Sequence, residues 1–296
     1  MPTGVYERVS GDELKRRLAA IRATQAGTLD QKIAESTRQI NEAASHGSGP
    51  IVCMFSGGRD STVIALLAQA TGRETRLLYN CTGLGNKASL DRVHRVANRL
   101  GLLLTITVPE MPAFEMWKAL GHFPIGPKRG HTYWKQRTPD LKTSPVQCCY
   151  QLKEKPARKA LKLWDAAVIL WGNRADDSNR RKLAVADHGV IQPPSTRWPM
   201  WSAQPVASWL DRDVQEFLAG HLPGEQWEDR AESGCQMCCT DIHRRDNNLS
   251  RLYLTDRASF DASIRSGLGQ QILHAKGIKA DAEQILQENP LTFLRV

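Results

Sequence analysis

The fold is decided by the stretch Ile51-Val52-Cys53-Met54-Phe55-Ser56-Gly57-Gly58-Arg59-Asp60-Ser61-Thr62. Its apolar first half predicts a buried strand, and its second half predicts a tight turn that opens a helix. Two glycines let the backbone approach an anion closely, and the free amides and positive dipole end of the following helix face that anion. An ordinary Gly-Gly turn is the alternative. We favour a nucleotide phosphate-binding loop made of Ser56, Gly57, Gly58, Arg59, Asp60, Ser61 and Thr62.

Asp60 is the unusual member of this loop. A carboxylate beside a phosphate repels it unless a magnesium ion, a substrate hydroxyl or an arginine lies between them. The loop therefore favours a nucleotide bound together with Mg²⁺, and it makes Asp60 a candidate catalytic residue.

The chain has 296 residues, which is enough for one large domain with appendages. A membrane span needs about 20 consecutive apolar residues, and the chain contains no such run; its first thirty residues carry charges throughout. We expect a cytoplasmic protein with no membrane partner. Seven cysteines in that reducing compartment point to a metal site and not to a disulfide framework.

The formal net charge of +9 is concentrated in one stretch. Residues 118–162 contain eleven Lys or Arg and two acidic residues, an excess equal to that of the whole chain. His131, Tyr133 and Trp134 lie inside the stretch. Basic side chains interleaved with rings suit an anionic polymer whose phosphates meet Lys and Arg while its bases stack. A solvated basic surface is the alternative, and we favour a tRNA or DNA partner.

Apolar strands alternate with helical patterns after Pro50. This alternation predicts an α/β fold with a doubly wound parallel sheet and a ligand crevice at the carboxyl ends of its strands. Ser56, Thr82 and Gly172 each follow such an end, so we expect three loops to converge. The predicted strands cover 51–55, 75–80, 102–108 and 166–171, and the predicted helices cover 61–71, 87–100 and a short segment from Phe114 to Leu120.

Three regions are predicted along the chain. Capping-box spacing at Ser10 with Glu13 and at Thr28 with Gln31 indicates two helices before the first strand. The expected regions are an N-terminal helical extension at 1–47, a nucleotide-binding domain at 48–232 and a cysteine-containing helical region at 233–296.

Four cysteines form the candidate metal site: Cys148, Cys149, Cys235 and Cys238. Adjacent cysteines point apart and suit two irons of a cubane better than one tetrahedral zinc ion, so the spacing favours a 4Fe-4S cluster. A four-cysteine zinc site and unligated buried thiols are the alternatives. Cys239 is either a replacement for Cys238 as ligand or a free thiol beside the cluster.

Together these residues resemble the phosphoadenosine phosphosulfate (PAPS) reductase superfamily, a branch of the adenine nucleotide alpha hydrolases. The loop 56–61 looks like the family's complete pyrophosphate loop, with Arg59 where many relatives carry Lys. Further motifs similar to the family's are Asn80-Cys81-Thr82-Gly83, Gly172-Asn173-Arg174-Ala175-Asp176-Asp177-Ser178, Pro199-Met200-Trp201-Ser202, Trp209, Asp213-Val214, Cys148-Cys149 with Lys153 and Pro156, and the Cys235–Cys238 pair.

The resemblance implies roles for single residues. Thr82, Gly83, Gly172 and Arg174 join the loop as nucleotide-binding positions. The Arg174 guanidinium is expected to bind phosphate, with a structural salt bridge as the alternative. The four cysteines resemble the cluster ligands of iron-sulfur members, among them adenylylsulfate reductases and DNA phosphorothioation sulfurtransferases.

Three functions follow from the resemblance. Sulfonucleotide reduction, which releases sulfite, needs a nucleophilic cysteine near the carboxyl terminus, and no cysteine follows Cys239. We prefer an ATP-dependent sulfurtransferase that adenylates an acceptor, so that a sulfur-donor protein displaces AMP, with Asp60, Arg174 and Cys239 as catalytic candidates. The third alternative is a non-enzymatic nucleotide-binding module with structural metal.

Overall fold

A computed structural model describes residues 9–85, 87–119, 148–227, 248–265, 267, 270, 273, 278 and 280–290. The chain forms two compact units, which are described separately below. The first contains Met1–Tyr79, Asp91–Ile106 and Arg158–Ala231, and the second contains Asn80–Leu90, Thr107–Ala157 and Glu232–Val296.

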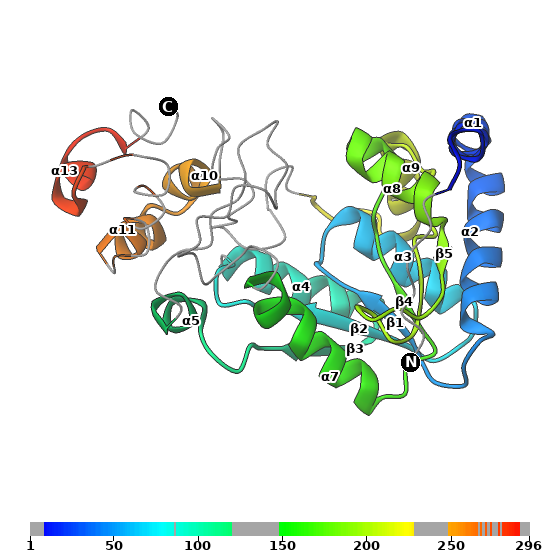
Figure 1. Ribbon diagram of the computed structural model, residues 1–296, viewed down its shortest axis with the longest axis horizontal. Helices are drawn as coiled ribbons and strands as arrows, with labels where there is room; N and C mark the ends of the chain where they lie inside the picture. The colour runs from blue at the N-terminus through cyan, green and yellow to red at the C-terminus, as the bar shows by residue number, and fades with distance from the viewer. Residues whose placement is uncertain are drawn as a thin grey trace. The chain divides into compact units, whose positions relative to one another are not determined.

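Helices and strands alternate through the first half of the chain (Figure 1). The strands are β1 (Ile51–Met54), β2 (Thr75–Asn80), β3 (Leu103–Thr107), β4 (Val168–Leu170), β5 (Ile191–Gln192) and β6 (Trp201–Ala203). The helices are α1 (Gly11–Ala26), α2 (Leu29–Ala44), α3 (Arg59–Ala70), α4 (Lys87–Leu100), α5 (Ala113–Ala119), η1 (Tyr150–Glu154), α7 (Lys155–Leu163), η2 (Ala175–Asp177), α8 (Asn179–His188), α9 (Asp211–His221), α10 (Asn248–Thr255), α11 (Arg257–Arg265) and α13 (Ala282–Gln287).

The six strands form one sheet in the order β3-β2-β1-β4-β6-β5. β1 pairs in parallel with β2 on one side and with β4 on the other, β4 pairs in parallel with β6, and the short β5 pairs antiparallel with β6. The chain order therefore reverses between β1 and β4. In open α/β sheets ligands bind at such a switch point, beside the carboxyl ends of the strands. The predicted α/β fold with a mostly parallel sheet is confirmed.

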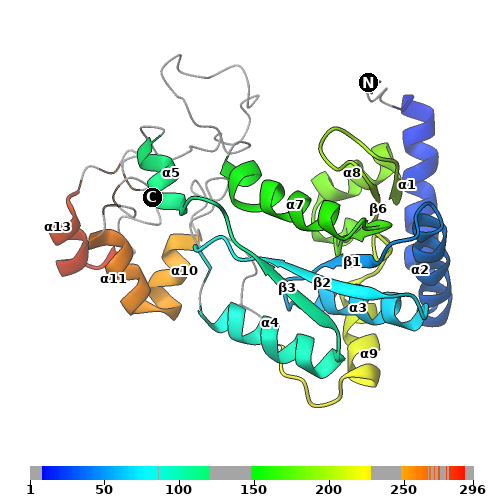
Figure 2. The ribbon, with the colours of Figure 1, turned by 90° about the horizontal axis from the view of Figure 1, so that it is seen from below.

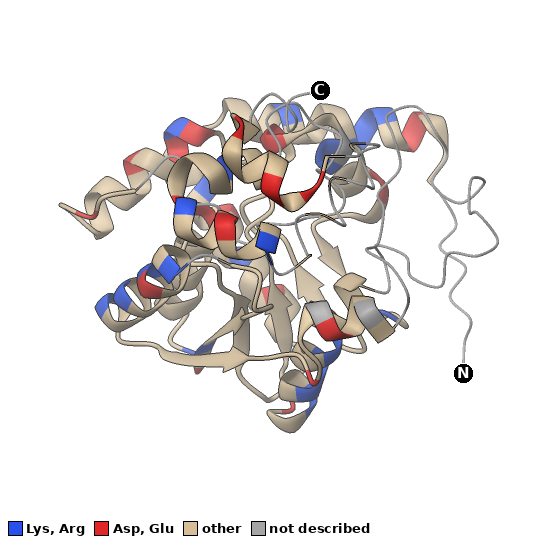
Figure 3. Ribbon diagram, turned by 90° about the vertical axis from the view of Figure 1, so that its left-hand side faces the viewer, with Lys and Arg blue, Asp and Glu red and all other residues tan. Residues whose placement is uncertain are grey.

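The central strands β1 and β4 are buried between helices. Figure 2 shows α7 on one face and α3 with α4 on the other. Arg76 is the one charged residue in the described strands, and in Figure 3 most of the blue and red lies on the helices while the arrows are mainly tan. Strands covered on both faces are expected to be apolar throughout, because both of their faces are removed from water.

The N-terminal helices begin where the capping pattern predicts. Ser10 Oγ accepts the amide of Glu13, and Thr28 forms a complete capping box with Gln31. Leu14, Leu18 and Ile21 of α1 pack against a small core shared with α8. The helical N-terminal region is thus part of the first unit.

The second unit has a separate helical core. Trp117 of α5 and Phe260 of α11 are among its fully buried side chains, together with Leu249 and Leu252 of α10 and Ile285 of α13. The predicted helical C-terminal region is confirmed in the described part. The boundaries 1–47, 48–232 and 233–296 stay a prediction.

Two strands were not predicted from the sequence. β5 and β6 contain two and three residues, too few for a periodic pattern to stand out. Helix α3 begins at Arg59, two residues before the predicted start, because Gly58 takes the N-cap position. Among the described residues no helix is both long and apolar enough to cross a membrane.

Candidate functional site

The turn after β1 is held in shape by its own serines. Ser61 Oγ lies 3.2 Å from the amide of Ser56, which it accepts, and 2.9 Å from the carbonyl oxygen of Gly58, to which it donates. Ser56 Oγ accepts the amide of Gly58 at 3.3 Å. These hydrogen bonds engage both serine hydroxyls and hold the backbone of residues 56–61 in a closed turn.

Gly57 is required by geometry. Its φ is +69°, a left-handed conformation that side chains rarely adopt. A Cβ at this position would lie 3.0 Å from the Cα of Val93 on α4. Both the backbone conformation and the close approach therefore exclude a larger residue.

The amino end of α3 offers free donors. Gly58 caps the helix without a side-chain hydrogen bond. Among the described residues, the amides of Arg59, Asp60 and Ser61 have no hydrogen-bond acceptor. Free amides at a helix start, together with the positive end of the helix dipole, attract an anion.

Gly172 brings a second loop to this helix start. It follows β4, and a Cβ on it would lie 2.9 Å from the carbonyl carbon of Asp60 and from the amide nitrogen of Ser61. Only a glycine allows this approach. The loop that carries Arg174 is thereby packed directly against the amino end of α3.

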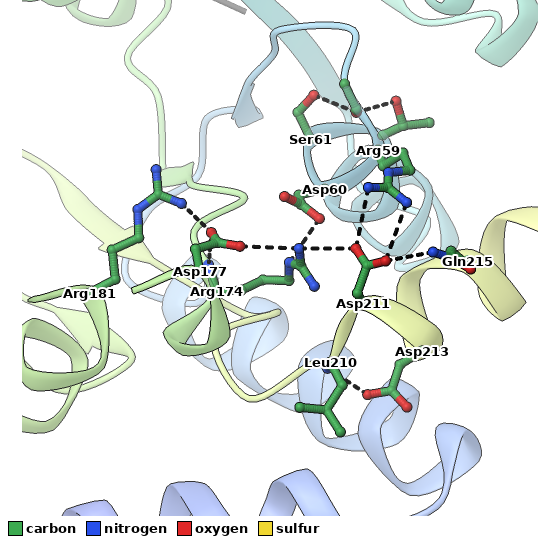
Figure 4. A network of polar contacts seen from close by, with 12 residues as sticks. Arg59, Asp60, Ser61, Arg174, Asp177, Arg181, Leu210, Asp211, Asp213 and Gln215 are labelled. Atoms are coloured by element: carbon green, nitrogen blue, oxygen red, sulfur yellow. Dashed lines mark hydrogen bonds and ion pairs between the residues drawn. The ribbon is translucent and has the colours of Figure 1, made fainter. Parts of the chain in front are cut away.

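Arg174 lies at the centre of a polar network (Figure 4). Its Nε is 3.0 Å from Asp60 Oδ1, and its Nη2 is 3.1 Å from Asp177 Oδ1 and 3.3 Å from Asp211 Oδ1. Arg181 pairs with the other oxygen of Asp177. The network thus joins residues from α3, η2, α8 and α9.

Two donors of Arg174 lack a hydrogen bond. The residue is 7% exposed, and its buried Nε and Nη1 have no hydrogen-bond partner among the described residues. Nε still forms an ion pair with Asp60. A buried donor left without a partner costs about 1–3 kcal/mol, so native proteins usually supply one. The unpaired Nη1 therefore points to a bound acceptor at this place.

Asp60 differs from the other described carboxyl groups with a shifted pKa, because its pKa is raised and theirs are lowered. Burial raises its pKa above the usual value, Arg174 opposes this shift, and Asp177 adds to it. The sequence allowed an arginine, in place of Mg²⁺, to offset the charge of Asp60, and Arg174 forms this ion pair. Among the described residues no group of three or more potential ligands is arranged to hold a metal ion.

Sequence reasoning missed Asp211 and Arg181. Asp211 is the first residue of α9, and its carboxylate contacts Arg59 as well as Arg174. The sequence marked the neighbouring Asp213 but contained no signal that connects Asp211 with the loop, because Arg59 and Asp211 are 152 residues apart.

The second unit contains two predicted nucleotide-binding residues. Thr82 is buried, and its Oγ1 accepts the amide of Leu84 at 3.2 Å. Gly83 has a φ of +73°. The structure brings Ser56 to Ser61, Gly172 and Arg174 together in the first unit, and the expected convergence of all three loops stays a prediction.

The cysteine site is described in part. Cys148 is buried and accepts a hydrogen bond from Trp117 Nε1 at 3.4 Å, and Cys149 beside it is half-buried. Cys235, Cys238 and Cys239 lie outside the described residues, as do residues 120–147 of the basic stretch. Cys53 is fully buried in β1, and burial raises the pKa of its thiol, so it is a core residue.

The chain was compared with known proteins. An uncharacterized protein of Methanocaldococcus jannaschii is 22% identical over 232 residues, which cover 76% of this chain and 50% of that protein. A glutamine-hydrolyzing GMP synthase of Elusimicrobium minutum is 35% identical over 88 residues, 29% of this chain and 16% of that protein. The chain thus spans half of the first relative and a small part of the second.

One solved structure and one family model also match the chain. The crystal structure of PAPS reductase from Candida auris has a TM-score of 0.44 and 14% identity, and the match covers 76% of this chain and 98% of that one. The family model for the phosphoadenosine phosphosulfate reductase domain matches residues 50–222, well over half of the chain. The resemblance predicted from the motifs is confirmed, and the chain belongs to the phosphoadenosine phosphosulfate reductase domain family.

Proposed function

We propose that the chain is an enzyme that binds ATP with Mg²⁺ at residues 56–62 and adenylates an acceptor for sulfur transfer. The observation that carries this proposal is the buried Nη1 of Arg174, which has no acceptor among the described residues and lies beside a helix start whose amides have none there either. These donors come from two loops that pack together, and they lack acceptors. Such a set of donors matches a polyphosphate ligand better than a neutral ligand.

The donors suggest how the nucleotide is held. The amides of Arg59, Asp60 and Ser61 bind the two terminal phosphates, which leave as pyrophosphate. Arg174 binds an oxygen of the α-phosphate, where negative charge develops during attack. Preorganised donors aimed at developing charge are the largest source of catalysis in such sites.

Asp60 fits a magnesium ion that arrives with the nucleotide. Mg²⁺ is commonly held by one or two carboxylates together with substrate phosphates, and so a protein cage of three ligands is not required. Asp60 would contribute one carboxylate oxygen, and the ion would neutralise charge on the phosphates. Thr82 and Gly83 are assigned to the same nucleotide on the family resemblance.

The reaction is balanced by two displacements. An acceptor oxygen forms a bond to the α-phosphorus as the bond from this phosphorus to pyrophosphate breaks. Sulfur at the sulfide oxidation level, delivered by a donor protein, then bonds to the acceptor carbon or phosphorus that carries the adenylated oxygen, as the bond from this atom to that oxygen breaks and the oxygen leaves with AMP. We assign the acceptor to tRNA or DNA held by the basic stretch 118–162, because its charge matches a phosphate backbone.

Cys148, Cys149, Cys235 and Cys238 would hold a 4Fe-4S cluster. The described pair fits this role, since adjacent thiols, one buried and one half-buried, suit two irons of one cubane. When bound, the cluster supplies a site that organises or relays sulfur. Cys239 is assigned as a catalytic thiol or exchangeable ligand beside it.

Product analysis tests the proposal. The anaerobically purified chain is incubated with ATP, Mg²⁺, sulfide and either tRNA or DNA, and nucleotides and nucleosides are identified by mass spectrometry. We expect AMP, pyrophosphate and a thiolated nucleoside. Calorimetry that detects no binding of ATP with or without Mg²⁺ would contradict the proposal.

Reduction of a sulfonucleotide is the second candidate, because the family model carries that activity in its name. The same preparation is therefore given adenylylsulfate or PAPS with reduced thioredoxin. Release of sulfite without ATP turnover would favour the reductase, whereas binding of nucleotide without either turnover would favour a non-enzymatic module.

A further inference from the structure

We infer that Asp211 is a positioning residue that joins Arg59 and Arg174 into one phosphate clamp. The inference rests on the proposed nucleotide site. Asp211 Oδ1 is 3.3 Å from Nη2 of Arg59 and 3.3 Å from Nη2 of Arg174. A single carboxylate oxygen thus lies between two guanidinium groups that come from different loops.

Arg59 depends on this carboxylate more than Arg174 does. Arg174 also has Asp60 and Asp177 as partners, whereas Asp211 is the only acidic partner of Arg59 among the described residues. Both guanidinium groups contact the same carboxylate oxygen, so this oxygen sets where the two side chains meet. Among the described residues, no other carboxylate forms an ion pair with both Arg59 and Arg174.

The start of the helix that carries Asp211 is held by hydrogen bonds to the buried Asp213. Asp211 begins α9, and the start of this helix is held by Asp213, whose Oδ2 accepts the amide of Leu210 at 2.6 Å. Lys32 of α2 donates to the same oxygen at 2.6 Å in a fully buried pair. A carboxylate on a rigid helix start can orient mobile arginine side chains, since its own backbone does not move.

The clamp is open to a ligand. The side chains of Arg59 and Asp211 are 30% and 44% exposed. Arg59 and Gln215, which both contact Asp211 Oδ2, line a cavity of about 510 Å³, whose lining does not include Arg174. An anion in this cavity can reach Arg59.

Three variants of the full chain separate positioning from other roles. Asp211→Ala removes the bridge, Asp211→Asn keeps the bridging oxygen and removes the charge, and Asp12→Ala removes the same charge from an exposed site on α1. Inorganic pyrophosphate with Mg²⁺ is titrated into each by calorimetry. Unfolding midpoints are measured in parallel.

We expect Asp211→Ala to bind pyrophosphate about tenfold more weakly than the wild type, a change of ~1.4 kcal/mol. Asp211→Asn should restore binding to within about threefold of the wild type, and Asp12→Ala should not change it. Recovery of pyrophosphate binding in Asp211→Asn but not in Asp211→Ala distinguishes positioning of the arginines from simple stabilisation of α9.

Two outcomes would overturn the inference. Pyrophosphate binding by Asp211→Ala that equals or exceeds that of the wild type would show that the carboxylate competes with the anion or is irrelevant to it. Equal weakening in Asn and Ala variants would show that charge and not the bridge is needed. A wild-type chain that does not bind pyrophosphate would instead remove the proposed function together with the inference.

Discussion

Lys32 Nζ lies 2.6 Å from Asp213 Oδ2, and the two side chains are 0% and 6% exposed. The pair connects α2 to the start of α9. Nearby, Ser36 of α2 donates to the carbonyl oxygen of Pro205 and accepts the indole N–H of Trp209. The helix α2 precedes the segment 50–222 that matches the family model, yet it is attached to that segment by buried polar bonds.

Lys32→Met should strongly destabilise the first unit. The substitution leaves the buried carboxylate of Asp213 with the more distant Arg212 Nε, at 3.7 Å, in place of its close partner. Removal of one partner from a buried pair costs about 3–5 kcal/mol. Chemical denaturation measures the change. Lys15→Met breaks an exposed pair with Asp12 and should cost less than about 1 kcal/mol. A similar cost for both variants would show that the buried pair contributes little.

Gly57→Ala should abolish ATP turnover and reduce stability by about 1–3 kcal/mol, because the residue is left-handed and its Cβ would meet Val93. Gly72→Ala is the matched control. Its φ is +74°, but nothing lies within 4 Å of the added Cβ. This variant should lose about 1 kcal/mol and retain turnover. Normal turnover by Gly57→Ala would remove the requirement for a tight turn at the loop.

Asp60→Asn should lose ATP turnover and change how stability depends on pH. Because the folded-state pKa of Asp60 is raised, the native wild type binds the proton more tightly than the unfolded chain does. Its free energy of unfolding therefore falls as pH rises from the ordinary pKa to the raised one. The variant does not titrate there, and so its stability relative to the wild type should increase across this window and level off above it.

Denaturation of Asp60→Asn and wild type from pH 3 to pH 7 measures this difference, with the exposed Asp12→Asn as control. A stability difference that does not change with pH would contradict the raised pKa. Retained ATP turnover would contradict the assignment of Asp60 as a catalytic residue.

Cys148→Ser should bleach the anaerobically purified protein and lower its iron content, since a serine hydroxyl is a poor substitute for a thiolate ligand. Cys81→Ser is the control, because Cys81 is outside the proposed ligand set and half-buried. Iron analysis and the visible absorption spectrum report the result. Unchanged colour and iron content in Cys148→Ser would refute the ligand assignment.

The sequence alone was sufficient to predict the loop, the parallel sheet and the family. These features depend on residues that are neighbours in the chain: a buried apolar run, two glycines and a helix that begins directly after them. The short strands β5 and β6 escaped prediction, because two or three residues contain no readable period.

Only the tertiary structure decided which carboxylates pair with the basic side chains. Lys32 and Asp213 are 181 residues apart, and Arg174 meets Asp211 across 37 residues. Many carboxylates in the chain have the same chemistry, and what selects Asp211 is the packing of α9 against α3. The conformation of the loop depends on residues that are adjacent in the sequence, so the loop was predictable. An ion pair between distant elements depends on how those elements pack, so the clamp was not predictable.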